Sequence, residues 1–209
     1  MNVIDDPSST LAGSYTHDMR GLDPMWRFIL SGSVVLAFAA PLLFAQSAPM
    51  MHKMLVAESE RLRPWAADKV LLDAVKAQNA RNVPLAEIQK IDEEWKAGKV
   101  RKELTTGPCA DRLRELAADH TQYVEVFVMD NQGALVCANS ITSDYWQGDE
   151  PKWLQSYKEG RGAVFIDRPR YDESAKGTLA MISLPILVGE NTVGVITVGV
   201  VMEKLPPAH

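Results

Sequence analysis

Hydrophobic and polar residues follow two different periods along this chain, and the change falls near residue 122. Before it, apolar residues recur at spacings of three and four, which predicts helices at 51–80, 84–98 and 108–120. Pro64 is expected to kink the first of these helices. After residue 122, alternation or short apolar runs predict strands, at 123–130, 134–139, 163–167, 178–188 and 192–202. Short turns between most of these strands favour a five-stranded antiparallel sheet with helices packed on one face, an α+β fold.

The N-terminal part of the chain carries a long apolar segment. The 24 residues from Phe28 to Met51 include no charged side chain. At about 1.5 Å per residue, a helix of this length exceeds the roughly 30 Å hydrocarbon core of a bilayer. We therefore expect a transmembrane helix in contact with membrane lipid. Four regions follow from this reading, namely a polar tail at 1–24, the transmembrane helix at 25–47, a helical stalk at 48–121 and a sheet domain at 122–209.

A cleaved signal peptide is the alternative interpretation of the apolar segment. Ala37-Phe38-Ala39 and Ala45-Gln46-Ser47 both resemble small-x-small cleavage sites. However, a signal peptide begins with a short basic region. The segment before Phe28 is 27 residues long and contains Asp5, Asp6, Asp18 and Asp23. The composition favours an uncleaved signal anchor.

Residues 140–153, "SITSDYWQGDEPKW", place bulky aromatic residues in a polar loop. A short helix is expected around 150–158, with Asp149 as its cap and Pro151 in its first turn. Loop aromatics beside charged residues are typical both of ligand pockets and of protein docking faces. A third reading is that these aromatics close the edge of the core and the charges are solvated.

Four segments in order, "VFVMDNQGALVCAN", "TSDYWQGDEPKW", "YDES" and "SLPILVGENTVGVITVGV", resemble the Cache family of PAS-like extracytoplasmic sensor domains, also called PDC domains. The resemblance covers roughly residues 123–202. It implies a domain outside the cytoplasmic membrane that binds a small molecule between the sheet and its loops. By this resemblance, the chain is a single-pass protein of the bacterial inner membrane with a periplasmic C-terminal domain.

The resemblance also indicates where a ligand would bind, because the connections after the second and third strands fold over the sheet in this family. Aromatic side chains supply apolar walls, Arg binds a carboxylate in a bidentate manner and Asp binds an amine. The residues expected to line the pocket are Asp144, Tyr145, Trp146, Trp153, Arg168, Arg170, Tyr171 and Asp172.

Several other chemistries find little support in the sequence. Cys109 and Cys137 either form a disulfide, as an oxidising compartment allows, or are two buried small residues. The four His residues have no metal-ligand spacing, and no catalytic or nucleotide-binding motif occurs, so we expect neither enzyme activity nor a cofactor.

Asp92-Glu93-Glu94 is interpreted as a solvated acidic helix face. The glycines of "VGVITVGV" suit close backbone approach.

Composition narrows the function further. Hydrophobic residues make up 46% and charged residues 23%, which is typical of a globular protein, and a net charge of −5 argues against nucleic-acid binding. The chain ends seven residues after its last predicted strand, so we expect no signalling output module of its own. The first hypothesis is a membrane-anchored Cache-type module that binds a small organic ligand, a partner membrane protein or both. The second is a structural accessory subunit of a larger membrane complex with a vestigial pocket. Either allows a homodimer through the helix at 51–80.

Overall fold

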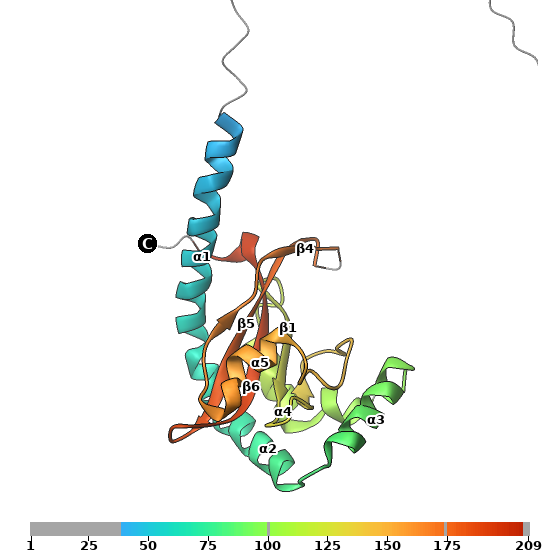
Figure 1. Cartoon of the computed structure of the whole chain (residues 1–209). Helices are drawn as coiled ribbons and strands as arrows, with labels where there is room; N and C mark the ends of the chain where they lie inside the picture. Colours follow the sequence, from blue (N-terminus) through green and yellow to red (C-terminus); the bar gives the residue numbers. More distant parts are fainter. Residues whose placement is uncertain (1–38, 100, 174, 207–209) are drawn as a thin grey trace, which may run out of the picture. The chain divides into compact units, whose positions relative to one another are not determined.

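The computed structural model describes residues 39–99, 101–173 and 175–206, which form an antiparallel sheet covered by helices on both faces (Figure 1). The helices are α1 (Ala39–Ala66), α2 (Lys69–Ala80), α3 (Leu85–Lys96), α4 (Gly107–Leu116) and α5 (Pro151–Tyr157). The strands are β1 (Tyr123–Met129), β2 (Leu135–Ala138), β3 (Phe165–Ile166), β4 (Arg170–Asp172), β5 (Gly177–Val188) and β6 (Asn191–Val201). Three 3₁₀ segments are η1 (Lys102–Thr105), η2 (Lys158–Gly160) and η3 (Met202–Lys204).

The sheet has the strand order β2-β1-β6-β5-β3, and β4 also pairs with β5. Every pairing is antiparallel. The predicted α+β fold with an antiparallel sheet is confirmed. The structure adds a sixth strand, β4, where a loop was predicted, and it places helices on both faces of the sheet rather than on one. The first correction arises because Arg170–Asp172, in the polar run after β3, continues the pairing along the edge of β5.

One face of the sheet packs against α1, α2 and α4. Val126 and Val128 of β1 point to this side, and they meet Leu55 and Leu62 of α1 and Leu71 of α2 in one buried cluster. Removing such side chains from water is the main stabilisation of a fold of this size. This face fixes the position of α1 along the sheet.

The helix predicted at 51–80 is two helices. Pro64 lies within α1, which continues to Ala66, and the break follows at Asp68. Oδ1 of Asp68 accepts hydrogen bonds from the backbone N–H groups of Val70 at 2.9 Å and Leu71 at 3.4 Å, and so caps α2. The cap, rather than the proline, sets the boundary.

The other face of the sheet packs against α3, α5 and the loop between β2 and α5. Phe127 and Met129 alternate with Val126 and Val128 along β1 and point to this side. The helix predicted at 84–98 is confirmed as α3, whose Ile88, Ile91 and Trp95 are buried there. The short helix predicted at 150–158 is α5, but Glu150 rather than Asp149 stands at its N-cap, without a side-chain hydrogen bond.

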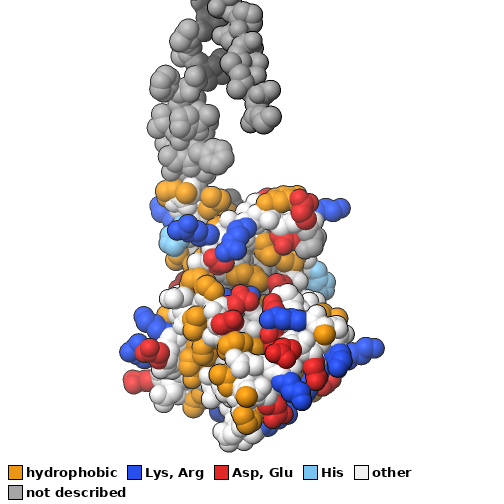
Figure 2. Space-filling view, turned by 45° about the vertical axis from the view of Figure 1, so that its right-hand side comes forward, with side chains coloured by type: hydrophobic (Ala, Val, Ile, Leu, Met, Phe, Trp, Pro, Cys, Tyr) orange, Lys and Arg blue, Asp and Glu red, His pale blue; other side chains and the backbone are white. Residues whose placement is uncertain are grey.

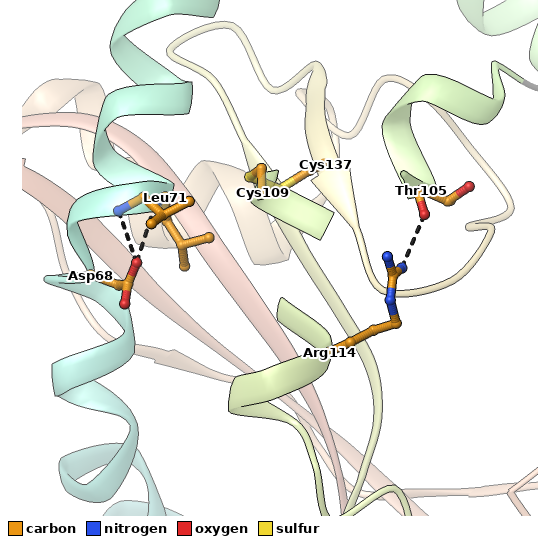
Figure 3. Close-up of a disulfide and its surroundings, with 7 residues drawn as sticks. Asp68, Leu71, Thr105, Cys109, Arg114 and Cys137 are labelled. Atoms are coloured by element: carbon orange, nitrogen blue, oxygen red, sulfur yellow. Dashed lines mark hydrogen bonds between the residues drawn. A yellow bond between two sulfur atoms is a disulfide. The ribbon is translucent and has the colours of Figure 1, made fainter. Parts of the chain in front are cut away.

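A disulfide joins Cys109 of α4 to Cys137 of β2, with the two Cα atoms 6.0 Å apart (Figure 3). Of the two readings left open by the sequence, the structure therefore has the bridge. Nearby, Nη1 of Arg114 donates to the backbone oxygen of Thr105 at 3.0 Å, which ties η1 to α4. Together these contacts fasten the segment before β1 to the edge of the sheet.

Within the residues that the structure describes, no helix has the length and apolar character needed to cross a membrane. The predicted tail at 1–24 and most of the predicted transmembrane helix at 25–47 lie outside the described residues. Residues 39–47 belong to α1.

Candidate functional site

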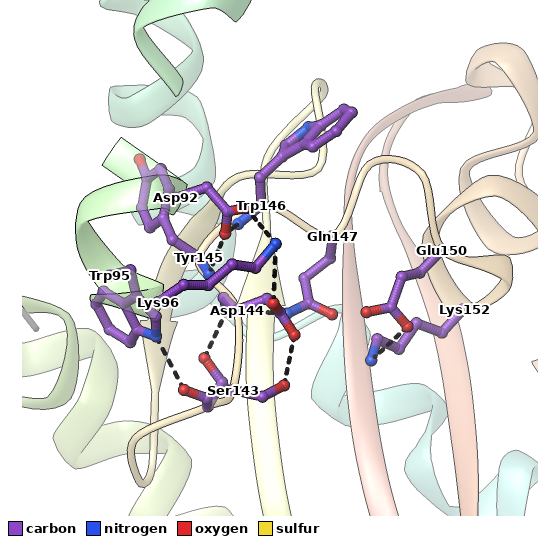
Figure 4. A network of polar contacts seen from close by, with 11 residues as sticks. Asp92, Trp95, Lys96, Ser143, Asp144, Tyr145, Trp146, Gln147, Glu150 and Lys152 are labelled. Atoms are coloured by element: carbon purple, nitrogen blue, oxygen red, sulfur yellow. Dashed lines mark hydrogen bonds and ion pairs between the residues drawn. The ribbon is translucent and has the colours of Figure 1, made fainter. Parts of the chain in front are cut away.

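The aromatic loop between β2 and α5 is fastened to α3 (Figure 4). Oδ1 of Asp92 accepts hydrogen bonds from the backbone N–H groups of Tyr145 at 2.9 Å and Trp146 at 3.0 Å. Nζ of Lys96 lies 2.6 Å from Asp92 and 3.1 Å from Asp144, and so joins the helix to the loop a second time. The expectation of a solvated acidic face is wrong for Asp92, which is only 6% exposed, because its carboxylate satisfies the backbone of the loop.

The indole groups of this region donate to the backbone of their own surroundings. Nε1 of Trp95 donates to the Thr142 oxygen at 2.9 Å, and Nε1 of Trp146 donates to the Gln132 oxygen at 2.8 Å. Nε1 of Trp153 donates to the Asp130 oxygen at 3.1 Å, and its ring stacks on Tyr157 with centroids 4.7 Å apart.

Tyr145 is 5% exposed, and burial raises the pKa of its hydroxyl. Burial alone would raise the pKa of Asp144, but a hydrogen bond from Ser143 and the ammonium of Lys96 outweigh this effect. The pKa of Asp144 therefore lies below its usual value. Asp144 is therefore held as a carboxylate by partners within the protein. This geometry corresponds to the reading in which the loop aromatics close the edge of the core.

Two glycines bring the loop against the β1–β2 turn. A Cβ atom built on Gly133 would lie 2.3 Å from the Cα of Gly148, and one on Gly148 would lie 2.4 Å from Nε1 of Trp146. Only glycine fits such an approach between two backbones. The residues from Tyr145 to Gly148 thus form a packed lid over the turn rather than the wall of a cavity.

The open space on this face lies beside the lid, over β1, β4 and β5, and we call it the sheet groove. It consists of one cavity of about 370 Å³ and a neighbouring one of about 230 Å³. Asp172 and Leu179 line both cavities and so mark the boundary between them. The other residues of the larger cavity are Val124, Glu125, Ser140, Ile141 and Ala175. The other residues of the smaller cavity are Asp167, Arg168, Arg170, Tyr171 and Met181.

The residues predicted to bind a ligand therefore fall into two groups. Arg168, Arg170, Tyr171 and Asp172 line the sheet groove, whereas Asp144, Tyr145, Trp146 and Trp153 belong to the lid and its supports. Arg170 and Tyr171 stand on β4 rather than in a loop, and Nη2 of Arg170 pairs with Asp167 at 3.0 Å. The structure brings together only the second half of the predicted set.

Glu125 of β1 is the residue of the groove that the sequence reasoning missed. Among the described residues its carboxylate has no hydrogen bond and no ion pair. Burial raises the pKa of Glu125; the carboxylates of Asp172 and Glu150 add to this, and only the ammonium of Lys152 opposes it. In the sequence, Glu125 is the polar member of an alternating strand, a pattern shared by ordinary solvent-facing residues, so no local signal marks it.

Lys152 at the start of α5 is held in place by its own neighbours. Its Nζ pairs with Glu150 at 3.0 Å and lies 5.6 Å from the centroid of the Phe127 ring, within the range of a cation–π contact. Lys152 therefore acts on Glu125 through space and is not its ion-pair partner. Among the described residues, the carboxylate of Glu125 is therefore left without an ion-pair partner, and it lines the larger cavity.

The other described parts of the surface are weaker candidates for a binding site than the sheet groove. A third cavity of about 150 Å³ lies between the end of α1 and β5, and its one charged residue, Arg63, is paired with Glu60. Among the described residues, no group of three or more His, Cys, Asp and Glu side chains is arranged to hold a metal ion. On the face that Figure 2 shows, basic and acidic side chains are interspersed with hydrophobic ones.

Comparison with known proteins gives structural neighbours. No family profile matches the chain, and no curated protein matches it. Among solved structures, the sensor domain of the Vibrio cholerae histidine kinase DctB is similar, with 16% identity, a TM-score of 0.42 and coverage of 78% of this chain and 57% of that one. The ligand-binding domain of the Pseudomonas aeruginosa amino acid chemoreceptor PctC, solved with GABA, has 12% identity, a TM-score of 0.37 and coverage of 65% and 58%.

A third neighbour is the ligand-binding domain of the Campylobacter jejuni chemoreceptor Tlp3, solved with 4-methylisoleucine. It has 13% identity, a TM-score of 0.36 and coverage of 75% of this chain and 65% of that one. Each of the three is a sensor or ligand-binding domain of a histidine kinase or a chemoreceptor. The chain spans less than two thirds of the length of each of them.

Proposed function

We propose that this domain is an extracytoplasmic binding module that takes a small organic ligand bearing an ammonium group in the sheet groove. The observation that carries the proposal is Glu125, a partly buried carboxylate without a hydrogen bond or ion pair among the described residues. Burial of an unpaired charge is costly unless a partner restores its interactions. A bound ammonium group would supply that partner.

The rest of the groove suits a small organic molecule. Its larger cavity, at about 370 Å³, falls within the range of small-ligand sites. Val124, Ile141 and Leu179 provide apolar walls, while Asp172 adds a second carboxylate on the same side. The arrangement of few polar groups among apolar ones is typical of a site that fixes the orientation of its ligand.

The smaller cavity gives the groove a second end. Arg170 is engaged by Asp167, whereas the guanidinium of Arg168 has no ion pair among the described residues. A ligand long enough to reach both cavities would present its ammonium group to Glu125 and a carboxylate to Arg168. The groove therefore favours a cation or a zwitterion over a dianion.

The Cys109–Cys137 disulfide supports a place outside the cytoplasm, since disulfides persist in oxidising compartments such as the bacterial periplasm. The retained membrane anchor and the partner membrane protein expected from the sequence belong to the same proposal. In this arrangement the domain reports the presence of its ligand to that partner.

Three four-carbon probes test the function because they differ only in charge: putrescine carries two ammonium groups, γ-aminobutyrate carries one ammonium and one carboxylate, and succinate carries two carboxylates. A ligand that binds only the folded state at 100 times its Kd stabilises the fold by about 2.7 kcal/mol. We expect putrescine or γ-aminobutyrate to raise the melting temperature of the full chain, and succinate to leave it unchanged.

The variant Glu125→Gln keeps the size of the side chain and removes its charge, so it should abolish the shift. Glu93→Gln, on the exposed side of α3, is the matched control and should retain it. A larger shift with succinate, or an equal shift in Glu125→Gln, contradicts the proposal. Unchanged melting with all three probes contradicts it as well and favours the accessory-subunit hypothesis.

A further inference from the structure

The start of β1 connects the sheet groove to α1 on the opposite side of the sheet. Tyr123 pairs with Val200 of β6, but Glu125 pairs with Gly199, so one extra residue, Val124, is inserted between them. This is a β-bulge, which changes the side to which the neighbouring residues point. Without it, Tyr123 and Glu125 would face the same side of the sheet.

The bulge instead sends these two side chains to opposite sides. Glu125 lines the groove together with Val124. Tyr123 packs in the cluster beneath α1, where its ring lies 5.0 Å from that of Trp65. Gly199 leaves room for this arrangement, because a Cβ atom there would lie 3.3 Å from the Cβ of Glu125.

On the α1 side, Tyr123 is bound to a buried carboxylate. Its hydroxyl donates to Oε1 of Glu58 at 2.6 Å, and Nε2 of Gln122 donates to the same oxygen at 3.2 Å. Glu58 is 0% exposed and is also paired with Arg61 at 2.8 Å. Burial and the contact with Glu58 raise the pKa of Tyr123, which keeps its hydroxyl protonated as the donor.

We propose that this bulge couples occupancy of the groove to α1, so that a cation bound at Glu125 tightens the attachment of α1 to the sheet through Tyr123 and Glu58. A carboxylate at Glu125 that is partly withdrawn from water and has no partner among the described residues lowers the stability of β1 at the bulge. A ligand cation offsets that cost on one side, and the stabilised strand then holds Tyr123 more firmly against Glu58 on the other. The inference rests on the proposed function for the identity of the occupant.

Hydrogen exchange of the α1 backbone tests the coupling without a ligand. Glu125→Gln removes the unpaired charge as a bound cation would, so we expect the amides of residues 55–62 to exchange at least about threefold more slowly than in the wild type. Asp167→Asn is the matched control, since it also removes one negative charge from the groove but lies outside β1. It should leave α1 exchange unchanged.

Tyr123→Phe provides the second arm, because it keeps the ring and removes the hydrogen bond to Glu58. In the Tyr123→Phe background, adding Glu125→Gln should no longer slow exchange in α1. Unchanged α1 exchange in Glu125→Gln overturns the coupling, and so does slowing that persists without the Tyr123 hydroxyl. Failure of the amine probes to bind, by contrast, bears on the proposed function and not on this exchange measurement.

Discussion

The carboxylate of Asp92 accepts a hydrogen bond from the backbone N–H of Tyr145 at 2.9 Å, across 53 residues of sequence. The same oxygen accepts from Trp146, and Lys96 pairs with the other oxygen of the carboxylate. One side chain of α3 thus satisfies two backbone donors of a loop that would otherwise be buried without partners. The position of the lid depends on this contact, and the sheet groove lies beside that lid.

Replacement of Asp92 tests how much the fold depends on the contact. Asp92→Ala leaves two buried N–H groups without their acceptor, so we expect a loss of about 2–3 kcal/mol in the free energy of unfolding. Glu93→Ala, at the next and exposed position, should change it by less than about 0.5 kcal/mol. Urea unfolding of both variants measures the difference. Equal losses would show that the loop does not need the carboxylate.

The stability of the domain should depend on the charge of Glu125 in a defined direction. Burial raises the pKa of Glu125 in the folded state, so the folded state binds this proton more tightly than the unfolded chain does. The charge therefore costs no stability below the unfolded pKa of about 4.3, and its full cost is present above the folded pKa.

We accordingly expect Glu125→Gln to be more stable than the wild type at neutral pH, with an advantage that shrinks as the pH falls toward 4. Urea midpoints of both proteins across this range give the difference directly. Glu190→Gln, on the exposed β5–β6 turn, should show a difference that stays flat with pH. An advantage that grows on acidification would contradict the assignment of an unpaired charge.

Gly133 is expected to be far less replaceable than another glycine with the same backbone conformation. Gly133 and Gly98 both have a φ angle of 83°, but a Cβ atom at Gly98 meets no atom within 4 Å. Gly98→Ala should therefore cost only the backbone strain of about 1–2 kcal/mol. Gly133→Ala adds a collision with the backbone of Gly148 and should cost clearly more, as thermal or urea unfolding would measure. Similar losses would show that the lid can move away from the turn.

The disulfide should account for a measurable share of stability. It closes a loop of 28 residues, which corresponds to about 3–4 kcal/mol in the chain-entropy model. The double variant Cys109→Ala/Cys137→Ala should lose an amount of this order. Dithiothreitol should destabilise the wild type similarly and leave the double variant unaffected. A wild type that is indifferent to reduction would contradict this expectation.

The helices and most of the strands could be predicted because their signals are local. Pro84 and Gly98 bracket α3, and the alternation of 123–130 corresponds to β1. The extra strand β4 was missed because Arg170, Tyr171 and Asp172 carry no alternating pattern, and it exists only through pairing with β5. Its partner residues, Gly177 to Leu179, lie only five to nine residues further along the chain, but a strand of three residues is too short to show a period.

Only part of the candidate site could be predicted, because the surroundings of some of its residues also depend on tertiary contacts. Arg168 and Asp172 were found by residue type, but Glu125 was missed because a bulge and a facing glycine decide where it points. Asp92 was misread as solvated because its acceptor role depends on a loop 53 residues away. Tyr145 and Trp146 were assigned to a pocket, but in the structure their backbone N–H groups bind Asp92 and hold that loop in place.

The edges of the sheet have a consequence for the behaviour of the protein at high concentration. One edge is β2, with 4 residues, and the other is divided between β3, with 2, and β4, with 3. A strand from another molecule needs a long, straight row of free N–H and C=O groups in order to add to a sheet. Among the described residues, none of these three short edge strands provides one, which disfavours edge-to-edge aggregation through them without relying on charge.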